Sequence, residues 1–204
     1  MIKIEFIDTL TNWGRVLNAA RTTVGKEPIK KKSFSASRFW NLIFQKKVVK
    51  KEPSSAWKKK ILLAEHSPIR LLIFDWKWVG IKSWVSVHFV RHKIGIEHFV
   101  KTQRIDRTGK QRDQSPQDAE VNHECVGNAQ TIINISRKRL CSSASKETRE
   151  AWQLFLEKLK DIEPELYSVS VKECLYRGFC PELKCCGYAD TEDFKNKLTE
   201  YRQH

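Results

Sequence analysis

The pattern of hydrophobic and polar positions predicts a chain that mixes strands and helices. Near the N-terminus, Ile2, Ile4 and Phe6 alternate with polar residues, which indicates a short strand. From about Thr11 to residues 21–23 the apolar positions recur every three or four residues, which predicts a helix with one buried face. That face carries Trp13, Val16, Leu17 and Ala20.

The next two elements are predicted to be a helix and a buried strand. Ser54 or Ser55 can cap a helix that runs to about Ala64. Pro68 ends this region, because a proline disfavours the helical conformation at the residue before it. Residues 69–78 are rich in Leu, Ile, Phe and Trp and therefore indicate a buried strand.

A second helix, an extended segment and a loop are expected in the centre of the chain. Helical spacing returns over residues 81–92, and the residues after it favour a strand or an extended loop. Residues 106–122 are polar and lack periodicity, so they are expected to form a surface loop.

Three further helices are predicted in the C-terminal half. They run from Asn128 to Leu140, from a cap at Ser145 to about Ile162, and from a cap at Thr191 towards the C-terminus. The inward positions are expected to be Ala129, Ile132, Ile133 and Ser136 in the first, Trp152, Leu154, Phe155 and Leu159 in the second, and Phe194, Leu198 and Tyr201 in the last.

Asn128 and Arg139 are eleven residues apart, about three helical turns, so both project from the same side of their helix. An amide and a guanidinium on a helix otherwise made for packing indicate a lined pocket. The alternative is an arginine whose stem covers apolar surface while its head reaches solvent.

Length and charge limit the architecture and the partners. The chain of 204 residues can bury one substantial core, so a single domain over 1–204 is expected. A formal net charge of +14 implies an anionic partner. Residues 1–60 hold 15 Lys or Arg against 4 Asp or Glu, which places +11 of the excess there. The basic stretch 24–53, with a predicted helix within 33–46, is either a nucleic-acid-binding arm or a solvated insertion.

The chain has no run of about 18 apolar residues, and its first residues lack the apolar core of a signal peptide. We therefore expect a soluble, cytoplasmic protein with no membrane partner.

Six cysteines occur, and four of them, Cys174, Cys180, Cys185 and Cys186, lie in a tail at 174–204. Their spacing differs from the two-residue knuckles of structural zinc sites, which favours reduced thiols and leaves a tail zinc site as the weaker alternative. No cysteine has a neighbouring His or Asp that would mark an activated nucleophile.

The most unusual stretch is 88–104, which combines four Lys or Arg residues, three His and one Gly directly after an aromatic run. Such a cluster suits an anionic ligand. The alternative is that Arg91 and Lys93 favour a helix C-terminus through its dipole, while His92 is a buried core histidine.

Several ordered motifs together resemble the flavin-dependent thymidylate synthases, and most closely their short, divergent phage relatives. The family motif is Arg-His-Arg followed by seven residues and a Ser, which here corresponds to Arg91-His92-Lys93 and Lys101. With one inserted residue, Thr102 and Arg104 instead match the family's Ser and Arg. Other matching positions are Ala19 to Thr22, His66-Ser67-Pro68, Arg112 with Pro116, Asn128-Ala129-Gln130, Arg139, Ala144 and Glu147.

The resemblance implies an α+β domain with a mainly antiparallel central sheet flanked by helices. It also implies a homotetramer whose sites are shared between subunits, located in the cytoplasm, or in the host cytoplasm if the protein is phage-encoded. The implied reaction transfers a one-carbon unit from methylenetetrahydrofolate to C5 of dUMP, with FAD as cofactor and NADPH as reductant. A non-catalytic nucleotide- or nucleic-acid-binding relative and a pyrimidine hydroxymethyltransferase are the alternatives.

The resemblance also assigns roles to residues. Arg139 would be catalytic, by stabilising negative charge on the uracil ring. Substrate contacts would come from His88, Arg91, Lys101, Thr102, Gln103, Arg104, Arg112 and Arg139, and flavin contacts from His66, Ser67, Arg91, His92, Lys93, Asn128, Gln130 and Asn134. The sequence departs from the family pattern at Lys93, Phe99, Lys101, Gln130 and Asn134.

Overall fold

The computed structural model describes residues 2–29, 52–109 and 111–203. The helix predicted within 33–46, and most of the basic stretch 24–53, lie outside these described residues.

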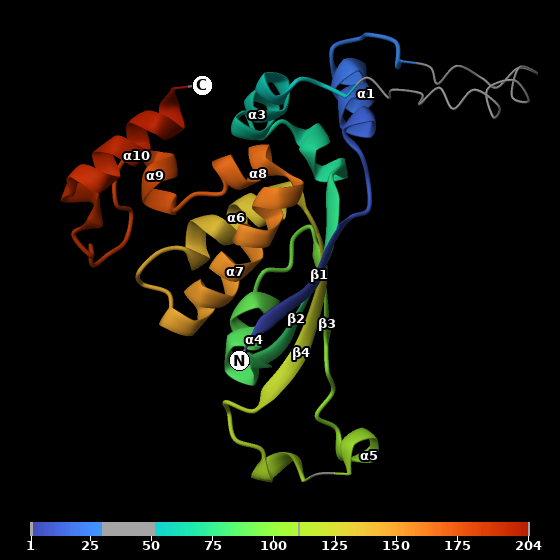
Figure 1. The fold of residues 1–204 in the computed structure, drawn as a ribbon, viewed down its shortest axis with the longest axis vertical. Helices are drawn as coiled ribbons and strands as arrows, with labels where there is room; N and C mark the ends of the chain where they lie inside the picture. Colours follow the sequence, from blue (N-terminus) through green and yellow to red (C-terminus); the bar gives the residue numbers. More distant parts are fainter. Residues whose placement is uncertain (1, 30–51, 110, 204) are drawn as a thin grey trace, which may run out of the picture.

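The centre of the fold is a sheet of four strands, all paired antiparallel, in the order β1-β2-β4-β3 (Figure 1). The strands are β1 (Lys3–Thr9), β2 (Ile73–Lys82), β3 (Ile96–Val100) and β4 (Glu120–Asn128). The longest, β2, lies between β1 and β4, with Asp75 opposite Asp8 on one side and Val126 on the other. The predicted α+β fold with an antiparallel sheet is confirmed.

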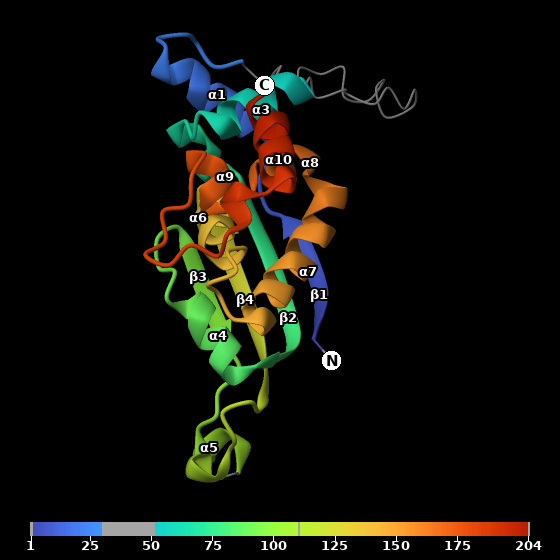
Figure 2. The ribbon, with the colours of Figure 1, turned by 90° about the vertical axis from the view of Figure 1, so that its left-hand side faces the viewer.

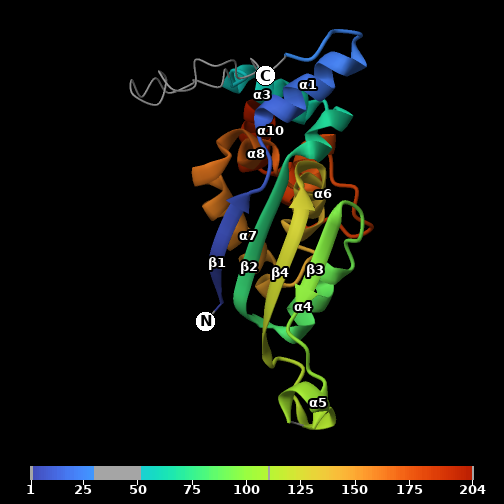
Figure 3. The ribbon, with the colours of Figure 1, turned by 90° about the vertical axis from the view of Figure 1, so that its right-hand side faces the viewer.

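Helices cover one face of the sheet. In Figure 2 they lie in front of the strands, whereas in Figure 3 the strands lie in front of them. The covering helices are α4 (Ser83–Val90), α6 (Ala129–Arg139) and α7 (Lys146–Ile162). At one end lie α1 (Trp13–Thr23), α3 (Ser55–Leu63) and the 3-10 helix η1 (Ser67–Leu71), and the C-terminal part adds α8 (Pro164–Val169), α9 (Glu173–Arg177), η3 (Tyr188–Asp190) and α10 (Glu192–Arg202).

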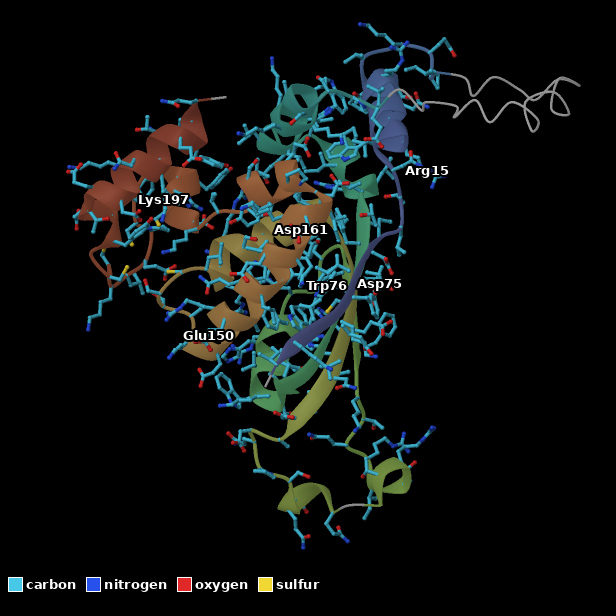
Figure 4. The ribbon with its side chains drawn as sticks, viewed as in Figure 1. Arg15, Asp75, Trp76, Glu150, Asp161 and Lys197 are labelled. Atoms are coloured by element: carbon cyan, nitrogen blue, oxygen red, sulfur yellow. The ribbon has the colours of Figure 1, made fainter. Side chains whose placement is uncertain are left out.

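The core between sheet and helices is aromatic. Alternation along β2 turns Trp76 towards the helices and Asp75 towards the opposite face, as Figure 4 shows. Trp76 packs 4.7 Å, centroid to centroid, from Phe155 of α7, and Trp78 stacks at the same distance on Phe89 of α4. These side chains are fully buried. Because truncating such a residue typically costs about 3–5 kcal/mol, this layer fixes α4 and α7 on the sheet.

Most predicted helices are confirmed together with their caps. Ser54, Ser145 and Thr191 each accept a hydrogen bond from a backbone N–H in the first turn of the helix that follows. Within α7, Leu154 is only partly buried and Leu156 takes the core position.

Two boundaries and one whole strand differ from expectation. Residues 69–71 belong to η1, and Ile81 belongs to β2, so the following helix begins at Ser83. The predicted loop over 106–122 overlaps the start of β4, a strand that was not predicted. Its inward positions are Val121, His123, Cys125 and Gly127. Because three of these four are not large apolar residues, the alternation of hydrophobic and polar positions is weak in this strand.

The connection from β3 to β4, residues 101–119, projects from the end of the sheet that is opposite α1 and α3 (Figures 1 and 3). We call it the arm. It contains the short helix α5 (Ile105–Thr108) and the 3-10 turn η2 (Arg112–Gln114), and most of its described side chains are exposed.

Within residues 2–29, 52–109 and 111–203, no helix combines the length and apolar character that crossing a membrane requires.

Candidate functional site

Residues 88–95, which we call the motif segment, lead from α4 into β3 and lie along α6. Gly95 has a positive φ of 73°. A Cβ atom at this position would lie 2.5 Å from Asn128 Nδ2 and 2.6 Å from Thr131 Oγ1. Only glycine fits this close approach without displacing its neighbours.

The N-terminal end of α6 holds the turn of the motif segment. Thr131 Oγ1 donates a hydrogen bond to the Ile94 carbonyl at 2.6 Å, and the Asn128 backbone N–H donates to the Gly95 carbonyl at 3.0 Å. Asn128 Oδ1 accepts from the Thr131 N–H and so caps the helix. Asn128 therefore organises the turn as well as the helix that follows it.

The C-terminal end of α6 holds the other end of the motif segment through Arg139. Its Nε donates to His92 Nε2 at 2.9 Å, and its Nη2 donates to the His88 carbonyl at 2.7 Å. Asn128 and Arg139 thus face the same segment, as their helical spacing predicts. Burial, and then the nearby Arg91, lower the pKa of this half-buried guanidinium from its ordinary value. Two of its five N–H donors are engaged in holding its position.

His92 is a neutral hydrogen-bond acceptor in this arrangement. Burial in the first place, then the charge of Arg139 and the nearby His98, lower its pKa to about 4. Its Nε2 accepts from Arg139, which fixes the tautomer with the proton on Nδ1. The positive charge of the motif segment therefore comes from Arg91 and Lys93, both of which are exposed.

His88 connects the motif segment to α7. Its Nδ1 lies 3.0 Å from Thr148 Oγ1, which in turn is 2.7 Å from Ser145 Oγ at the cap of α7. Burial, then Arg139 and Arg91, lower the pKa of His88. Its backbone carbonyl, rather than its ring, is the group that meets Arg139.

Gln130 and Asn134 lie on a different side of α6, next to Glu65. Gln130 Nε2 donates to Glu65 Oε2 at 2.5 Å and lies 3.5 Å from Asn134 Oδ1. Arg137 forms an ion pair with the same carboxylate and stacks over Tyr176 at 3.5 Å. Burial alone would raise the pKa of Glu65, but the hydrogen bonds from Arg137 and Gln130 bring it below its usual value.

The turn that precedes β2 borders this Glu65 cluster. His66 and Ser67 are both exposed, and they follow directly after Glu65, which has a positive φ of 45°. A non-glycine residue in this conformation is uncommon and is held in place by its surroundings. Here the contacts of its carboxylate with α6 provide that restraint.

The remaining predicted substrate-binding residues lie on the arm, whereas Arg139 is the last residue of α6. Lys101, Thr102 and Arg104 are exposed, and Gln103 is partly buried. Arg104 makes a two-pronged ion pair with Asp106, at 3.0 Å for each contact. The backbone of Arg112 lies in η2, and its side chain is outside what the structure describes.

Four residues adjoining the motif segment form a group that was not predicted: Ser86, His98, His123 and Cys125. Of these, only His98 was counted in the cluster at 88–104. Their side chains form a connected group that is buried except for the half-buried His98. The available signal was the two-residue spacing of His123 and Cys125, which places both on one face of a strand. Because the sequence did not predict β4, this spacing alone did not identify a shared strand face.

The tail cysteines do not form a comparable group. In the described part of the chain, three metal-ligating atoms come within 4.8 Å of one another only at His98, His123 and Cys125. Cys186 Sγ instead accepts a hydrogen bond from Ser142 Oγ at 3.0 Å, and Cys185 and Cys186 are exposed. The zinc site in the tail stays a prediction.

Comparison with known proteins supports the fold. No protein-family model matches the sequence, and no curated protein matches it. The structure is similar to flavin-dependent thymidylate synthase ThyX from Helicobacter pylori, solved with FAD and dUMP, with a TM-score of 0.57 and 13% identity over 84% of this chain and 99% of that chain. It is also similar to the UMP/dUMP methylase PolB from Streptomyces cacaoi, solved with 5-Br dUMP, with a TM-score of 0.58 and 10% identity over 84% of this chain and 97% of that chain. The chain therefore has the fold of the flavin-dependent thymidylate synthases.

Proposed function

We propose that this protein is a flavin-dependent enzyme that transfers a one-carbon unit from methylenetetrahydrofolate to C5 of dUMP, with NADPH as reductant and dTMP as product. The observation that carries the proposal is the placement of Arg139. Its hydrogen bonds to His92 and to the His88 carbonyl fix the guanidinium beside the motif segment. This is the residue that the sequence resemblance assigns to activation of the pyrimidine.

Arg139 suits that role electrostatically. As C5 becomes nucleophilic, negative charge develops on the uracil ring, and a prepositioned donor stabilises that charge without further reorganisation. Its Nε and Nη2 each already donate a hydrogen bond, so the remaining N–H groups can be offered to the ring. Neutral His92 holds the guanidinium without cancelling its charge.

The residues of the motif segment fit the anionic part of a flavin nucleotide. Arg91 and Lys93 are exposed, and the turn at Gly95 packs directly against Asn128 and Thr131, which holds this cationic segment beside α6. Together with His92 and Asn128, Arg91 and Lys93 would hold FAD at its pyrophosphate end. His66 and Ser67 of the turn before β2, and Gln130 and Asn134 of α6, would border the cofactor. When bound, the reduced flavin supplies the hydride that completes the methyl group.

The phosphate of dUMP would be bound by Arg112 and by residues 101–104 of the arm. Because the arm projects from the chain that carries it (Figure 1), we propose that it completes the site of a neighbouring subunit in a homotetramer. We place this assembly in the cytoplasm, or the host cytoplasm if the protein is phage-encoded. Binding of nucleic acid by residues 24–53 stays a prediction.

One observation favours a second candidate. Gln130 and Asn134 replace the Arg and His of the family pattern, and Gln130 is hydrogen-bonded to Glu65, beside the exposed turn at His66 and Ser67. A site with fewer groups free for flavin would bind the nucleotide without turnover, or would stop at the hydroxymethyl stage.

The experiment that tests the proposal is a single-turnover assay with purified protein, FAD, NADPH, methylenetetrahydrofolate and dUMP, followed by mass analysis of the nucleotide. We expect dTMP, and an oxidised-flavin absorption band that is lost in the soluble Arg91→Ala/Lys93→Ala double variant. Hydroxymethylated product would indicate the transferase alternative. Unchanged dUMP from protein that binds it would contradict the proposal and favour the binding-protein alternative.

A further inference from the structure

Three metal-ligating side chains converge under the motif segment, on the helix-covered face of the sheet. His98 of β3 is paired in register with Cys125 of β4, and His123 precedes Cys125 by two positions. Residues two apart on a strand point to the same face, and directly paired residues do so across strands. Strand geometry therefore brings the two imidazoles and the thiol together.

The ligating atoms are close enough to share one ion. His98 Nδ1 lies 2.9 Å from His123 Nε2, and Cys125 Sγ lies 3.3 Å from each of these nitrogens. In a tetrahedral zinc site with Zn–N near 2.0–2.1 Å and Zn–S near 2.3 Å, ligand atoms are about 3.3–3.6 Å apart. An ion would need the three side chains to separate by a few tenths of an ångström.

The other nitrogen of each imidazole is held in place. His98 Nε2 donates to the His92 carbonyl at 2.8 Å, so its Nδ1 carries the lone pair that faces the centre of the group. His123 Nδ1 lies 3.1 Å from Ser86 Oγ. Metal-binding histidines almost always have such a partner on the second nitrogen, because it fixes the tautomer and the orientation of the ring.

The surroundings suit a buried, ordered site. His123 and Cys125 are fully buried, and His98 is half-buried on the edge strand, which leaves a path from solvent. The ring of Trp78 packs 5.6 Å from the His123 ring. Thiolate and imidazole together select zinc- and copper-class ions over magnesium or calcium.

We propose that His98, His123 and Cys125 form a binding site for a thiophilic transition-metal ion of the zinc class. Binding releases the thiol proton of Cys125 to solvent and leaves the three ligands as one thiolate and two neutral imidazoles. The remaining proton of His123 then lies on Nδ1 and is donated to Ser86 Oγ. Solvent can occupy a fourth position.

The alternative is a hydrogen-bonded chain without metal. In it Ser86 donates to His123 Nδ1, His123 Nε2 donates to His98 Nδ1, and His98 Nε2 donates to the His92 carbonyl. The two arrangements exclude each other, because the proton on His123 Nε2 occupies the position of the metal. Either way the group connects both strands to His92, which accepts from Arg139.

The test uses the full chain and must separate this group from the tail thiols. The starting protein is therefore a variant with Cys174, Cys180, Cys185 and Cys186 replaced by Ser. Zn²⁺ alone is added, the excess is removed by gel filtration, and bound zinc is measured by mass spectrometry. Co²⁺ is added in parallel, because a Co²⁺–thiolate bond gives a charge-transfer absorption band.

We expect about one zinc ion per chain and the cobalt–thiolate band in the tail variant. A further Cys125→Ser substitution should remove both, and a Cys141→Ser substitution should leave both unchanged. If Cys125→Ser does not fold, His98→Asn, at the half-buried edge position, serves instead. Ser86→Ala should weaken zinc binding about 10- to 100-fold, as loss of a partner to a ligating histidine typically does.

Absence of bound zinc and of the cobalt band from the folded tail variant would overturn the site. Retention of both after Cys125→Ser and after His98→Asn would also overturn it. These measurements need no dUMP and no flavin, so the result is independent of the proposed enzymatic function.

Discussion

The two halves of the candidate site differ in how they are held. Around Arg139 the site is built on α6 and the motif segment, which are joined by hydrogen bonds of 2.6–3.0 Å over a buried aromatic core. The arm is mostly exposed, and the described hydrogen bonds of Lys101, Thr102 and Arg104 stay within it or reach Asn122. The first half is organised by its own chain. The second half carries exposed cationic side chains, and under our proposal it meets the phosphate of dUMP in the site of a neighbouring subunit.

This contrast indicates which substitutions should affect stability and which should affect only binding. A residue on the α6 half is restrained by packing, so changing it alters the folded state or the chemistry. A residue on the arm makes few contacts within its own chain. Replacing it should therefore alter the affinity for an anion and leave the folded state nearly unchanged.

The largest expected effect is on turnover, from Arg139→Ala. Losing one donor to developing charge typically costs about 10²–10³ in rate. Arg139→Lys keeps the charge without the planar fork and should recover only part of that loss. Single-turnover rates with dUMP provide the measurement, with Lys158→Ala, exposed on α7, as the control. Equal rates in the wild type, Arg139→Ala, Arg139→Lys and Lys158→Ala would show that Arg139 takes no part in the reaction.

A smaller effect, on stability, is expected from Gly95→Ala. The positive φ and the contacts with Asn128 and Thr131 should together cost about 1–3 kcal/mol in the free energy of unfolding. Gly109→Ala is the matched control, because Gly109 has a similar φ of 67° but has open space where an added methyl group would lie. Urea unfolding of both variants isolates the contribution of the close approach. An equal loss in both would show that the approach of α6 does not restrict residue 95.

The next effect is on substrate binding by the arm. The double variant Lys101→Ala/Arg104→Ala should raise KM for dUMP about tenfold or more, because each charge-assisted hydrogen bond contributes roughly 1.5–3 kcal/mol. The melting temperature should stay nearly unchanged, because the exposed Arg104–Asp106 pair contributes only about 0–1 kcal/mol. Asp106→Ala controls for loss of that pair. A large drop in melting temperature with KM unchanged would assign these residues to the fold instead.

The smallest expected effect is on the pH dependence of stability. The pKa of His88 is below its ordinary value of 6.5 in the folded protein, so the unfolded chain takes up the proton first as pH falls. The free energy of unfolding should therefore decrease as pH falls below about 6.5, until the folded pKa is passed. The slope should be smaller in His88→Gln. Denaturant titrations between about pH 7 and pH 4 test this, and an unchanged slope would show that His88 titrates alike in both states.

Sequence periodicity predicted the elements whose buried positions are hydrophobic. It did not predict the strand whose buried positions include polar and reactive side chains. Trp13, Ile132 and Phe155 mark their helices because their burial follows the helical period. β4 was not predicted because two of its buried positions hold His123 and Cys125 instead of large apolar residues. For the site, spacing alone placed Asn128 and Arg139 on one side of α6. It could not show that Gln130 meets Glu65, 65 residues away, because such a contact depends on tertiary packing.

The central claim is that α6 of one chain and the arm of another form one site, and co-expression of two impaired variants tests it most directly. Arg139→Ala lacks the first half and Arg112→Ala the second, and differently tagged copies are purified together. If sites are shared, random assembly should restore about a quarter of the sites and hence measurable conversion of dUMP. Conversion no greater than that of the separate variants, from chains that co-purify as mixed oligomers, would contradict the account.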